Sequence, residues 1–503
     1  MTDNERSDQQ VQEKQQTLEE VVANRRQKLE ELRQAGINPY PYRFDKTHAV
    51  DEVLAAFDKL AADGTVVRMA GRMMLKRKMG KASFADIHDQ TGKIQIYVKQ
   101  DNVGADVYQM FSKLDLGDFL GVAGTLFVTK TGEKSVHVNE LVLLAKSLHP
   151  LPDKHAGLVD KEMRYRRRYV DLIVNPEVRE TFIRRSRIIQ SIREFFNSRG
   201  FLEVETPILQ PIYGGATARP FKTHHNTLHT DLYLRIADEL YLKRLLVGGF
   251  EKVWEFCKDF RNEGMDRLHN PEFSMVELYW AYADYTDIMR LVEDMFRKVV
   301  FDLHGAYKIR YEDHEIDFEP DFRRVSMVDA VREKAGFDLI DMDYATARKA
   351  AKAAGVDVDK AINWGKVVEA CFEHFVEPTL IQPTYITDFP QEISPLAKVH
   401  RNHPRLVERF ELFIAGLECA NAFSELNDPD DQRRRFEAQA EAAKAGDEEA
   451  HVIDEDYLTA LMYGMPPTGG LGFGVDRLVM LLTGSHSIRD VIFFPQMKPE
   501  REE

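Results

Sequence analysis

Five short segments rich in β-branched and aromatic residues, between residues 66 and 146, restrict most strongly the folds available to this chain. They are VVRMAGRMM, KASFADIHD, KIQIYVKQ, FLGVAGTLFVTKT and KSVHVNELVLLA, and turn-forming residues such as Gly92 and Gly132 separate them. Five short strands with glycine turns are typical of a small barrel, and the OB-fold is the usual five-stranded case. We therefore predict an OB-fold over residues 66–148. Such barrels bind oligonucleotides by stacking bases on aromatic side chains within a basic groove.

The charge of this segment fits that interpretation. The whole chain of 503 residues has a net charge of −15, which makes it a poor candidate for nonspecific nucleic-acid binding. Residues 66–146 nevertheless hold 12 Lys and Arg against 8 Asp and Glu. The chain thus contains a basic module within an acidic protein.

The segments before the barrel read as a polar tail and a helical extension. Residues 1–16 are polar, so we expect a disordered tail and no secretory signal. Thr17 and Glu20 form a capping box that begins an amphipathic helix, which ends at Gly36 within an extension over residues 17–65. Its basic residues form either a solvated face or a contact with RNA. No segment is apolar enough to span a membrane, and three cysteines without CxxC spacing indicate the cytoplasm.

A second, larger domain is predicted over residues 178–503, after a linker at 149–177. The linker contains the run RYRRR, which is either a solvated face or an RNA contact. From residue 201 onward, strands and helices mix without βαβ periodicity, which favours an antiparallel sheet flanked by helices. Residues 325–380 are mostly helical in pattern and are expected to form an insertion. The predicted fold class is therefore multidomain α+β.

Two common nucleotide motifs fail in this chain. Residues 470–474 read GLGFG and do not fit the GxGxxG pattern of dinucleotide-binding folds. Gly80 and Lys81 have no glycine five residues earlier and no Ser or Thr directly after, so they are not a P-loop. Any ATP site in this chain must therefore be built in another way.

The segment from Phe260 to Tyr279 reads as strand, loop and strand. Because strand side chains alternate between faces, Phe273, Glu277 and Tyr279 share one face, while the intervening apolar residues face a core. A carboxylate beside apolar groups must be paired. Arg261, at the end of the first strand, could grip a phosphate or carboxylate with two hydrogen bonds.

Two later segments add acids and glycines. Glu411 and Glu418 lie in the apolar run FELFIAGLE, where a strand bent at Gly416 could bring them together. Two carboxylates with substrate phosphates are the usual ligands of Mg²⁺. The run PPTGGLGFGVDR, at residues 466–477, lets backbone approach a ligand closely and places Arg477 at a helix start, where it suits a triphosphate or an adenine ring.

Pro207 after a long predicted helix, the block from Phe260 to Glu277, and the glycine-rich run with Arg477 resemble motifs 1, 2 and 3 of the class II aminoacyl-tRNA synthetases. From about residue 15 to the end, the chain is similar to the bacterial-type lysyl-tRNA synthetases. The strings GGATARPF at 214–221, LRIA at 234–237, DY at 284–285 and FSELND at 423–428 carry this closer likeness. The resemblance implies activation of lysine with ATP, then transfer to the 3′-terminal ribose of tRNA(Lys), by a cytoplasmic homodimer that uses Mg²⁺.

The resemblance also implies a role for each matching residue. Arg261 would bind the substrate carboxylate and the α-phosphate, and Glu411 and Glu418 would carry Mg²⁺. ATP would be held by Arg261, Glu263, His269, Asn270, Phe273 and Arg477. Lysine would be bound by Gly215, Glu239, Glu277, Tyr279, Asn421, Phe423 and Glu425. In the barrel, anticodon bases would be read by Phe84, Gln95 and Glu133.

The charges of the amino-acid pocket favour lysine independently of the resemblance. Glu277, Glu425 and the Tyr279 hydroxyl offer acceptors to a side-chain ammonium, and Glu239 suits an α-amino group. An aspartyl or asparaginyl enzyme needs a cation or an amide donor at that end of the pocket. Two alternatives stay open: a catalytically altered paralogue that binds RNA or regulates, and a lysyltransferase that acts on protein. The first lacks catalytic residues that are present here, and the second lacks the predicted barrel.

Overall fold

The computed structural model describes residues 17–152, 158–444 and 453–500, and the chain divides into two compact units, Met1–Val159 and Asp160–Glu503. The predicted disordered tail at 1–16 lies outside the described residues. Each unit has its own hydrophobic core. None of the helices in the described ranges is long and apolar enough to cross a membrane.

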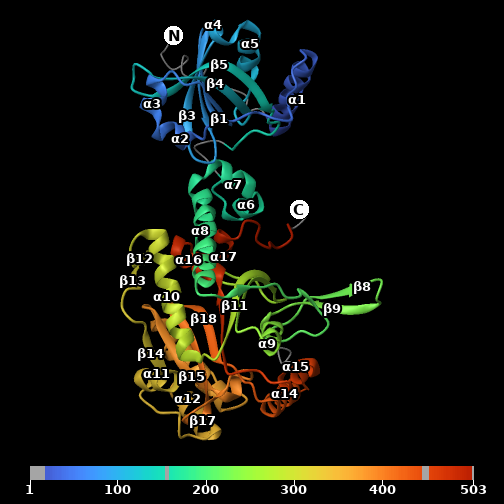
Figure 1. Cartoon of the computed structure of the whole chain (residues 1–503), viewed down its shortest axis with the longest axis vertical. Helices are drawn as coiled ribbons and strands as arrows, with labels where there is room; N and C mark the ends of the chain where they lie inside the picture. Colours follow the sequence, from blue (N-terminus) through green and yellow to red (C-terminus); the bar gives the residue numbers. More distant parts are fainter. Residues whose placement is uncertain (1–16, 153–157, 445–452, 501–503) are drawn as a thin grey trace, which may run out of the picture. The chain divides into compact units, whose positions relative to one another are not determined.

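The first unit is a closed barrel with strand order β1-β2-β3-β5-β4, drawn in blue and cyan in Figure 1. Burial alternates along the strands, and Ile87, Ile96 and Val98 fill the interior. The β3–β5 pair is parallel and the other pairs are antiparallel. The five predicted runs form these five strands, which confirms the OB-fold. The strands are β1 (Val67–Met79), β2 (Ala82–His88), β3 (Lys93–Lys99), β4 (Phe119–Val128) and β5 (Lys134–Ala145).

Helices surround the barrel and precede it. Thr17 caps the first helix by accepting a hydrogen bond from the Glu20 backbone, as the capping box predicts. Basic residues of this helix hold it to the barrel: Arg25 donates to the Ser147 carbonyl at 3.2 Å, and Lys28 pairs with Asp115 at 2.6 Å. The helices are α1 (Leu18–Gln34), α2 (Val50–Ala55), α3 (Phe57–Ala62), α4 (Gln100–Val103) and α5 (Ala105–Lys113).

The second unit is built on a nine-stranded sheet with order β14-β15-β17-β18-β19-β11-β10-β6, and β16 pairs with β17. Two pairs, β14–β15 and β10–β6, are parallel, and the remaining pairs of this sheet are antiparallel, as predicted for a class II catalytic domain. The strands are β6 (Leu202–Glu203), β10 (Lys252–Phe260), β11 (Glu272–Ala281), β14 (Arg323–Ser326), β15 (Thr384–Pro390), β16 (Val399–His400), β17 (His403–Ile414), β18 (Leu417–Ser424) and β19 (Thr468–Gly474).

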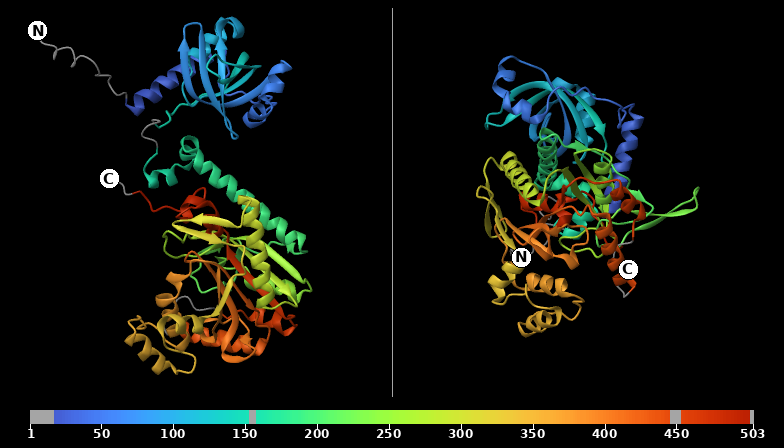
Figure 2. Two further views of the ribbon diagram at one scale, coloured as in Figure 1. Left: turned by 90° about the vertical axis from the view of Figure 1, so that its left-hand side faces the viewer. Right: turned by 60° about the horizontal axis from the view of Figure 1, so that its bottom comes forward.

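Three helices cover one face of this sheet, as Figure 2 shows, and leave the other face for the cavity described below. Phe196, Met295 and Leu478, one from each helix, join Val276 and Leu278 of the sheet in one apolar core. Val276 and Leu278 therefore occupy the core-facing side, as strand alternation predicts. The three helices are α8 (Pro176–Ser198), α10 (Tyr285–His304) and α16 (Val475–Thr483).

The remaining elements complete the second unit. The segment 325–380 contributes three helices with a core of their own, and two small sheets flank the main one. The helices are α9 (Glu239–Val247), α11 (Met327–Ala335), α12 (Tyr344–Ala353), α13 (Trp364–Phe375), η1 (Glu377–Thr379), η2 (Gln391–Ile393), α14 (Pro429–Lys444), α15 (Glu455–Met462) and α17 (Ile488–Val491). The small-sheet strands are β7 (Leu209–Gln210), β8 (Lys222–His225), β9 (Thr230–Leu234), β12 (Lys308–Tyr311) and β13 (His314–Asp317).

The segment predicted as a linker, residues 149–177, differs from that expectation. It contains α6 (Lys161–Arg166) and α7 (Arg168–Val174), which belong to the second unit. Arg168 is buried, pairs with Asp171 at 2.7 Å and donates to the backbone carbonyls of Arg489 and Phe493. Part of the arginine run is therefore neither solvated nor free for RNA, because it holds α7 against the C-terminal segment.

A second difference concerns the acids near Gly416. The chain does not bend within one strand there, but reverses between β17 and β18. Ala415 and Gly416 both have positive φ, 52° and 72°. Two successive residues with positive φ are the requirement of a tight hairpin turn whose twist matches the flanking strands. Glu411 and Glu418 therefore lie on adjacent strands of a hairpin.

Candidate active site

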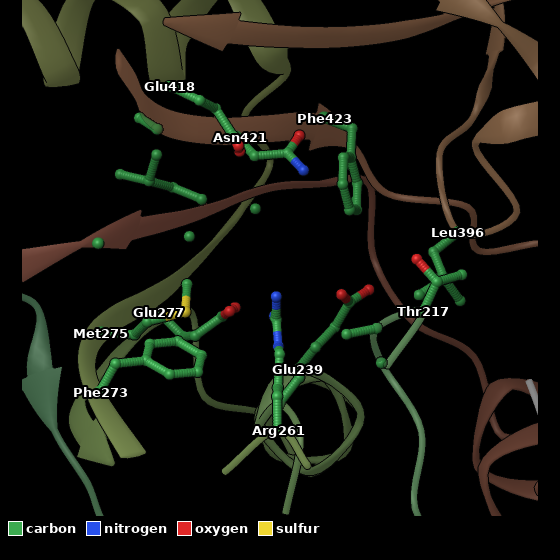
Figure 3. Close-up of a pocket in the computed structure, with 18 of the residues that line it drawn as sticks. Thr217, Glu239, Arg261, Phe273, Met275, Glu277, Leu396, Glu418, Asn421 and Phe423 are labelled. Carbon is green, nitrogen blue, oxygen red and sulfur yellow. The ribbon is translucent and has the colours of Figure 1, made fainter. Parts of the chain in front are cut away.

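The open face of the large sheet carries a cavity of about 510 Å³, a volume typical of small-molecule sites. Strands β11, β18 and β19, the loop after β10, and helices α9 and α13 contribute to its lining. Figure 3 shows Arg261 reaching into it between Glu277 and Glu239. The predicted residues that line it are Gly215, Glu239, Arg261, Glu263, His269, Asn270, Phe273, Glu277, Tyr279, Glu418, Asn421, Phe423, Glu425 and Arg477.

Three buried carboxylates gather at one end of the cavity: Glu239, Glu277 and Glu425. The Tyr279 hydroxyl donates to Glu277 Oε2 at 3.0 Å. Burial, reinforced by Glu239 and other nearby carboxylates, raises the pKa of Glu277 well above its usual value. Burial also raises the pKa of Glu425 to about 8. A cationic ligand at this end of the cavity would stabilise the ionised forms of these carboxyls.

Glycines of β19 make room for these acids. A Cβ atom on Gly470 would lie 1.8 Å from Glu425 Oε1, and one on Gly472 would lie 2.9 Å from Glu277 Oε1. Both glycines lie in the central strand between β11 and β18. The glycine-rich run thus lets carboxylates, as well as a ligand, approach the backbone closely.

The prediction from sequence missed Lys243, which contacts two acids of this pocket, and the charged lining residues Lys366, Glu369, Glu392, Arg409 and Asp476. The Lys243 side chain is fully buried and forms ion pairs with Glu239 and Glu425. Burial alone disfavours the ammonium charge, but the carboxylates of Glu239 and Glu425 raise the pKa of Lys243 above its usual value. The spacing of Glu239 and Lys243, four residues apart on a helix, is a signal that sequence contains. Its burial depends on Glu425, which is distant in sequence.

Arg261 connects the acidic end to the rest of the cavity. Its guanidinium lies 5.1 Å from the centre of the Phe273 ring, which positions a cation over an aromatic face. Arg261 follows β10 and Phe273 lies in the paired strand β11, so the β10–β11 register holds them together. The buried Nε of Arg261 has no hydrogen-bond partner among the described residues. The arrangement therefore offers a donor to an anionic ligand.

A second arginine, Arg477, also lines the cavity. Arg477 donates to the Glu418 backbone carbonyl at 2.8 Å and to Glu418 Oε2 at 3.1 Å. Its other nitrogen lies 3.3 Å from His269 Nε2. On the far side of that ring, His269 Nδ1 lies 2.8 Å from the Asp266 carboxylate. Asp266, His269, Arg477 and Glu418 thus form a connected polar chain along one wall.

Asn270 has both ends of its amide engaged with the backbone. Its nitrogen donates to the Glu272 carbonyl at 2.6 Å, and its oxygen accepts from the Gln496 N–H at 3.3 Å. Its role visible in the structure is therefore to shape the loop between β10 and β11. At the opposite wall, Gly215 has φ of +87°, and a Cβ there would lie 3.1 Å from Ala237, so only glycine fits easily.

Glu411 is the one predicted catalytic-domain residue outside the cavity lining. It pairs in register with Asn421, and its carboxylate accepts from Arg409 at 2.6 Å. Burial raises the pKa of Glu411 to about 8, with Glu418 adding to the rise and Arg409 opposing it. Two nearby carboxylates whose negative charges repel each other fit a hard divalent cation, provided that ligand phosphates supply the remaining oxygens.

A different group of potential metal ligands lies behind the pocket. Asp238, Cys257 and Asp259 each offer one atom within 4.8 Å of the others, and all three are buried. Arg235 lies 3.3 Å from Asp259 and supplies a counter-charge there. Burial raises the pKa of Asp238 well above its usual value, so a proton compensates this carboxyl.

The predicted anticodon residues lie on the first unit. The Phe84 ring lies 4.8 Å from that of Tyr97, which stacks on His137 at 5.6 Å. Gln95 accepts from the Ser135 hydroxyl at 2.9 Å, and Glu133 is exposed in the turn before β5. Tyr97 and His137, with Phe127, extend the aromatic face beyond the single ring predicted. Strand alternation could have found Tyr97, because it shares the face of Gln95.

Comparison with known proteins agrees with this geometry. Residues 160–498 match the family model described as tRNA synthetases class II (D, K and N), and residues 67–144 match the OB-fold nucleic acid binding domain. The lysine–tRNA ligase of Carboxydothermus hydrogenoformans is 56% identical over 96% of this chain and 99% of its own length. Those of Pelotomaculum thermopropionicum and Shouchella clausii are also 56% identical, over 96% of this chain and 96% and 97% of their own lengths. The chain therefore belongs to the lysine–tRNA ligase family of class II aminoacyl-tRNA synthetases.

Proposed function

We propose that this chain activates L-lysine with ATP to form lysyl-adenylate and pyrophosphate, and then transfers lysine to the 3′-terminal ribose of tRNA(Lys). The observation that carries this proposal is the buried cluster of Glu239, Glu277 and Glu425 in a cavity that also holds Arg261. Lysine is the amino acid that brings two ammonium groups and one carboxylate to such a site. Family membership and the anticodon-type barrel support the same activity.

Lysine lies with its side chain at the acidic end of the cavity. Glu277 and Glu425, helped by the Tyr279 hydroxyl, accept hydrogen bonds from the side-chain ammonium. Glu239 and the backbone at Gly215 receive the α-amino group. The other lysine-binding residues, Asn421 and Phe423, line the same wall. Charged hydrogen bonds in a buried site are strong, so this end rejects neutral side chains.

ATP occupies the other part of the cavity. Phe273 and Arg477 enclose the adenine ring, and Glu263, His269 and Asn270 hold the nucleotide in the loop after β10. Arg261 pairs with the lysine carboxylate and the α-phosphate at once. A carboxylate oxygen then attacks the α-phosphorus in line, the bond to the bridging oxygen breaks, and pyrophosphate leaves. Positioning and charge stabilisation provide the rate, and no protein nucleophile takes part.

Glu411 and Glu418 hold Mg²⁺ in this proposal. When bound, Mg²⁺ neutralises charge that develops on the phosphate oxygens. The raised pKa of Glu411 supports the assignment, because a cation relieves the repulsion between the Glu411 and Glu418 carboxylates. Arg409 donates a hydrogen bond to Glu411 and Arg477 donates one to Glu418, so each carboxylate is held by one arginine.

Transfer to tRNA uses both units of the chain. The 3′-terminal hydroxyl attacks the adenylate carbonyl and loses its proton, and AMP leaves. The barrel face with Phe84, Gln95 and Glu133 binds the anticodon, with bases stacked on aromatic rings. Those rings are half-buried on the outside of the barrel, which supports a stacking role.

The active form is a homodimer in the cytoplasm. Four exposed apolar residues lie close to Pro207 in the sequence: Leu202, Ile208, Leu209 and Ile212 are 37–49% exposed. Large apolar side chains exposed to water favour burial in a protein interface. Sedimentation equilibrium should therefore give twice the 58.0 kDa mass of one chain. A monomer at micromolar concentration would refute the dimer without affecting the activity proposed.

The test is ATP–pyrophosphate exchange, measured with each of the twenty amino acids separately, with Mg²⁺ and without tRNA. Exchange with lysine alone is the expected result. Exchange with aspartate or asparagine would overturn the assignment of Glu277 and Glu425. No exchange from folded protein would favour the regulatory paralogue. Charging of tRNA, rather than of protein, with labelled lysine then separates the ligase from a protein lysyltransferase.

A further inference from the structure

Lys243 contacts two of the acids that line the cavity, Glu239 and Glu425, although no ligand role predicted above uses it. It lies on α9, one turn after Glu239, and its ammonium pairs with Glu239 and Glu425. The Nζ atom also lies 5.8 Å and 5.6 Å from the ring centres of Tyr279 and Phe423. Its side chain is 0% exposed, so water cannot replace these partners. A fully buried ammonium must be paired with opposite charges in its surroundings.

The charges around Lys243 can be counted residue by residue. Glu239, Glu277 and Glu425 contribute three acidic groups, and Lys243 and Arg261 contribute two basic ones. Other groups that face Lys243 and its partners are Tyr279 on β11, Tyr457 on α15 and Arg409 on β17, while Asp238 and Asp259 interact with Glu277. Arg409 is paired with Glu411 at 2.6 Å and Asp259 with Arg235 at 3.3 Å, so neither pair changes the count. Burial raises the pKa of Asp238 well above its usual value, which favours its neutral form. With all three acids ionised, the five side chains counted carry one negative charge in excess.

We propose that Lys243 is a specificity-determining residue, which neutralises one acid of the pocket so that the occupied site is balanced only by an amino acid with one net positive charge. This inference rests on the proposed function, since it assumes that lysine binds at these acids. Lysine carries two ammonium groups and one carboxylate, and so supplies the missing charge. A neutral amino acid leaves one buried carboxylate without a partner, which is strongly unfavourable.

Lys243 also orients the acids that contact the substrate. Glu425 is ion-paired with it, yet neither oxygen of Glu425 has a hydrogen bond of good geometry from the described residues. Glu425 therefore keeps its hydrogen-bonding capacity for a substrate ammonium. Because Lys243 and Glu239 are one helical turn apart, the pair is held within one rigid element. Lys243 thus acts through Glu239 and Glu425 and is a positioning residue, not a catalytic one.

The central variant is Lys243→Met, which keeps the length of the side chain and removes its charge. Without the ammonium, the acids retain protons more firmly, and lysine must displace them to bind. The expected result in lysine-dependent ATP–pyrophosphate exchange is a KM for lysine raised at least about tenfold. The KM for ATP and the kcat should change less than about threefold. The difference in KM for lysine between Lys243→Met and the wild type should shrink as the pH rises, because the acids then ionise without the Lys243 ammonium.

A double variant separates charge from packing. Glu239→Gln combined with Lys243→Met removes one acid together with its partner and restores the charge count of the wild-type pocket. We expect its KM for lysine to lie below that of Lys243→Met alone. The effects of the two substitutions are then not additive, because the second partly reverses the first. An equal or higher KM in the double variant would overturn the proposal. If Lys243→Met alone does not fold, the double variant is compared with Glu239→Gln alone, and a KM for lysine that is not lower than in that single variant would overturn the proposal.

Lys146→Met is the matched control. Lys146 is likewise buried, with a side chain 0% exposed, and pairs with Asp115 and Asp118 at 2.7 Å and 3.0 Å in the first unit. The Lys146→Met variant should lose stability but keep the wild-type KM for lysine. A wild-type KM and pH profile in Lys243→Met would refute the inference alone, whereas absence of lysine-dependent exchange in the wild type would refute the proposed function itself.

Discussion

At the scale of single residues, the acidic end of the cavity shows how burial turns ordinary glutamates into ligands for an ammonium. Glu277 and Glu425 lie on opposite sides of β19, where Gly470 and Gly472 leave space for their carboxylates. Burial removes water that would otherwise stabilise the ionised form, which raises the pKa of both carboxyls, so that each takes up a proton at higher pH than an exposed glutamate does. A substrate ammonium stabilises the ionised forms and so favours release of that proton.

This exchange of proton for ammonium predicts how lysine binding varies with pH. Burial raises the pKa of Glu425 to about 8 in the empty pocket, whereas bound lysine favours its ionised form. Lysine must therefore displace a proton at low pH and binds more readily once the acid has ionised. The KM for lysine in pyrophosphate exchange should fall as the pH rises from about 6.5 to about 8.5. A KM that stays constant over this range would contradict the account.

Gly470→Ala tests the close approach of backbone and acid. The added Cβ would lie 1.8 Å from Glu425 Oε1, so the carboxylate must move away from its substrate position. We expect kcat/KM for lysine to fall by about 10- to 100-fold, from an overpacking cost of about 1–3 kcal/mol.

Gly469→Ala provides the control in the adjacent position. Its Cβ would lie 2.7 Å from Ile288, a core residue on the other face of the sheet. This variant should lose thermal stability and keep its KM for lysine. Equal losses of lysine kcat/KM in Gly469→Ala and Gly470→Ala would show that the effect of Gly470 comes from folding and not from Glu425.

At the scale of elements, α7 and the C-terminal segment are joined by one buried cation. Arg168 pairs with Asp171 at 2.7 Å and donates to carbonyls of the segment around Arg489 and Phe493. Arg168→Ala removes one cationic partner of the buried Asp171 carboxylate and leaves the backbone carbonyls of Arg489 and Phe493 without this hydrogen-bond donor. We expect a loss of about 3–5 kcal/mol of stability.

Thermal unfolding of the purified chain would measure this effect. The transition of the second unit should move down by several degrees, while the barrel's transition stays in place, because Arg168 belongs to the second unit. Arg184→Ala, which removes a more exposed pair with Glu180, is the control and should change stability little. An unchanged midpoint in Arg168→Ala would refute the role given to that residue.

Elements differ in how well sequence predicts them. The barrel strands and β11 follow from alternation of apolar and polar residues, since a half-buried strand imposes a period of two. The Ala415–Gly416 hairpin was predicted as a bend, because the same glycine permits either backbone path. Lys243 and the buried arginine of α7 were missed for a shared reason. Their partners, such as Glu425 and the carbonyl of Phe493, come from distant segments that only folding brings near.

At the scale of the whole molecule, the chain separates amino-acid chemistry from RNA recognition. Residues up to Val159 form one compact unit, and the remainder forms another that holds the complete cavity. The aromatic face of Phe84, Tyr97 and His137 is confined to the first unit. Changes on this face should therefore leave the activation of lysine unaffected.

Phe84→Ala tests this separation. Loss of one stacking ring costs about 1–3 kcal/mol per base, so the KM for tRNA in aminoacylation should rise about tenfold or more. Lysine-dependent pyrophosphate exchange without tRNA should be unchanged. A variant that loses both activities would show that Phe84 supports the fold of the barrel or couples the two units.

The central claim is that a buried, charge-balanced pocket recognises the side-chain ammonium of lysine. The most direct test compares lysine with norleucine, which has a methyl group where lysine has the ammonium, in pyrophosphate exchange. A site built to pair a buried acid with its substrate rejects an analogue that lacks the partner by about 10⁴-fold. The account predicts a loss of kcat/KM on this scale for norleucine. Values within tenfold of each other would contradict recognition by Glu277 and Glu425.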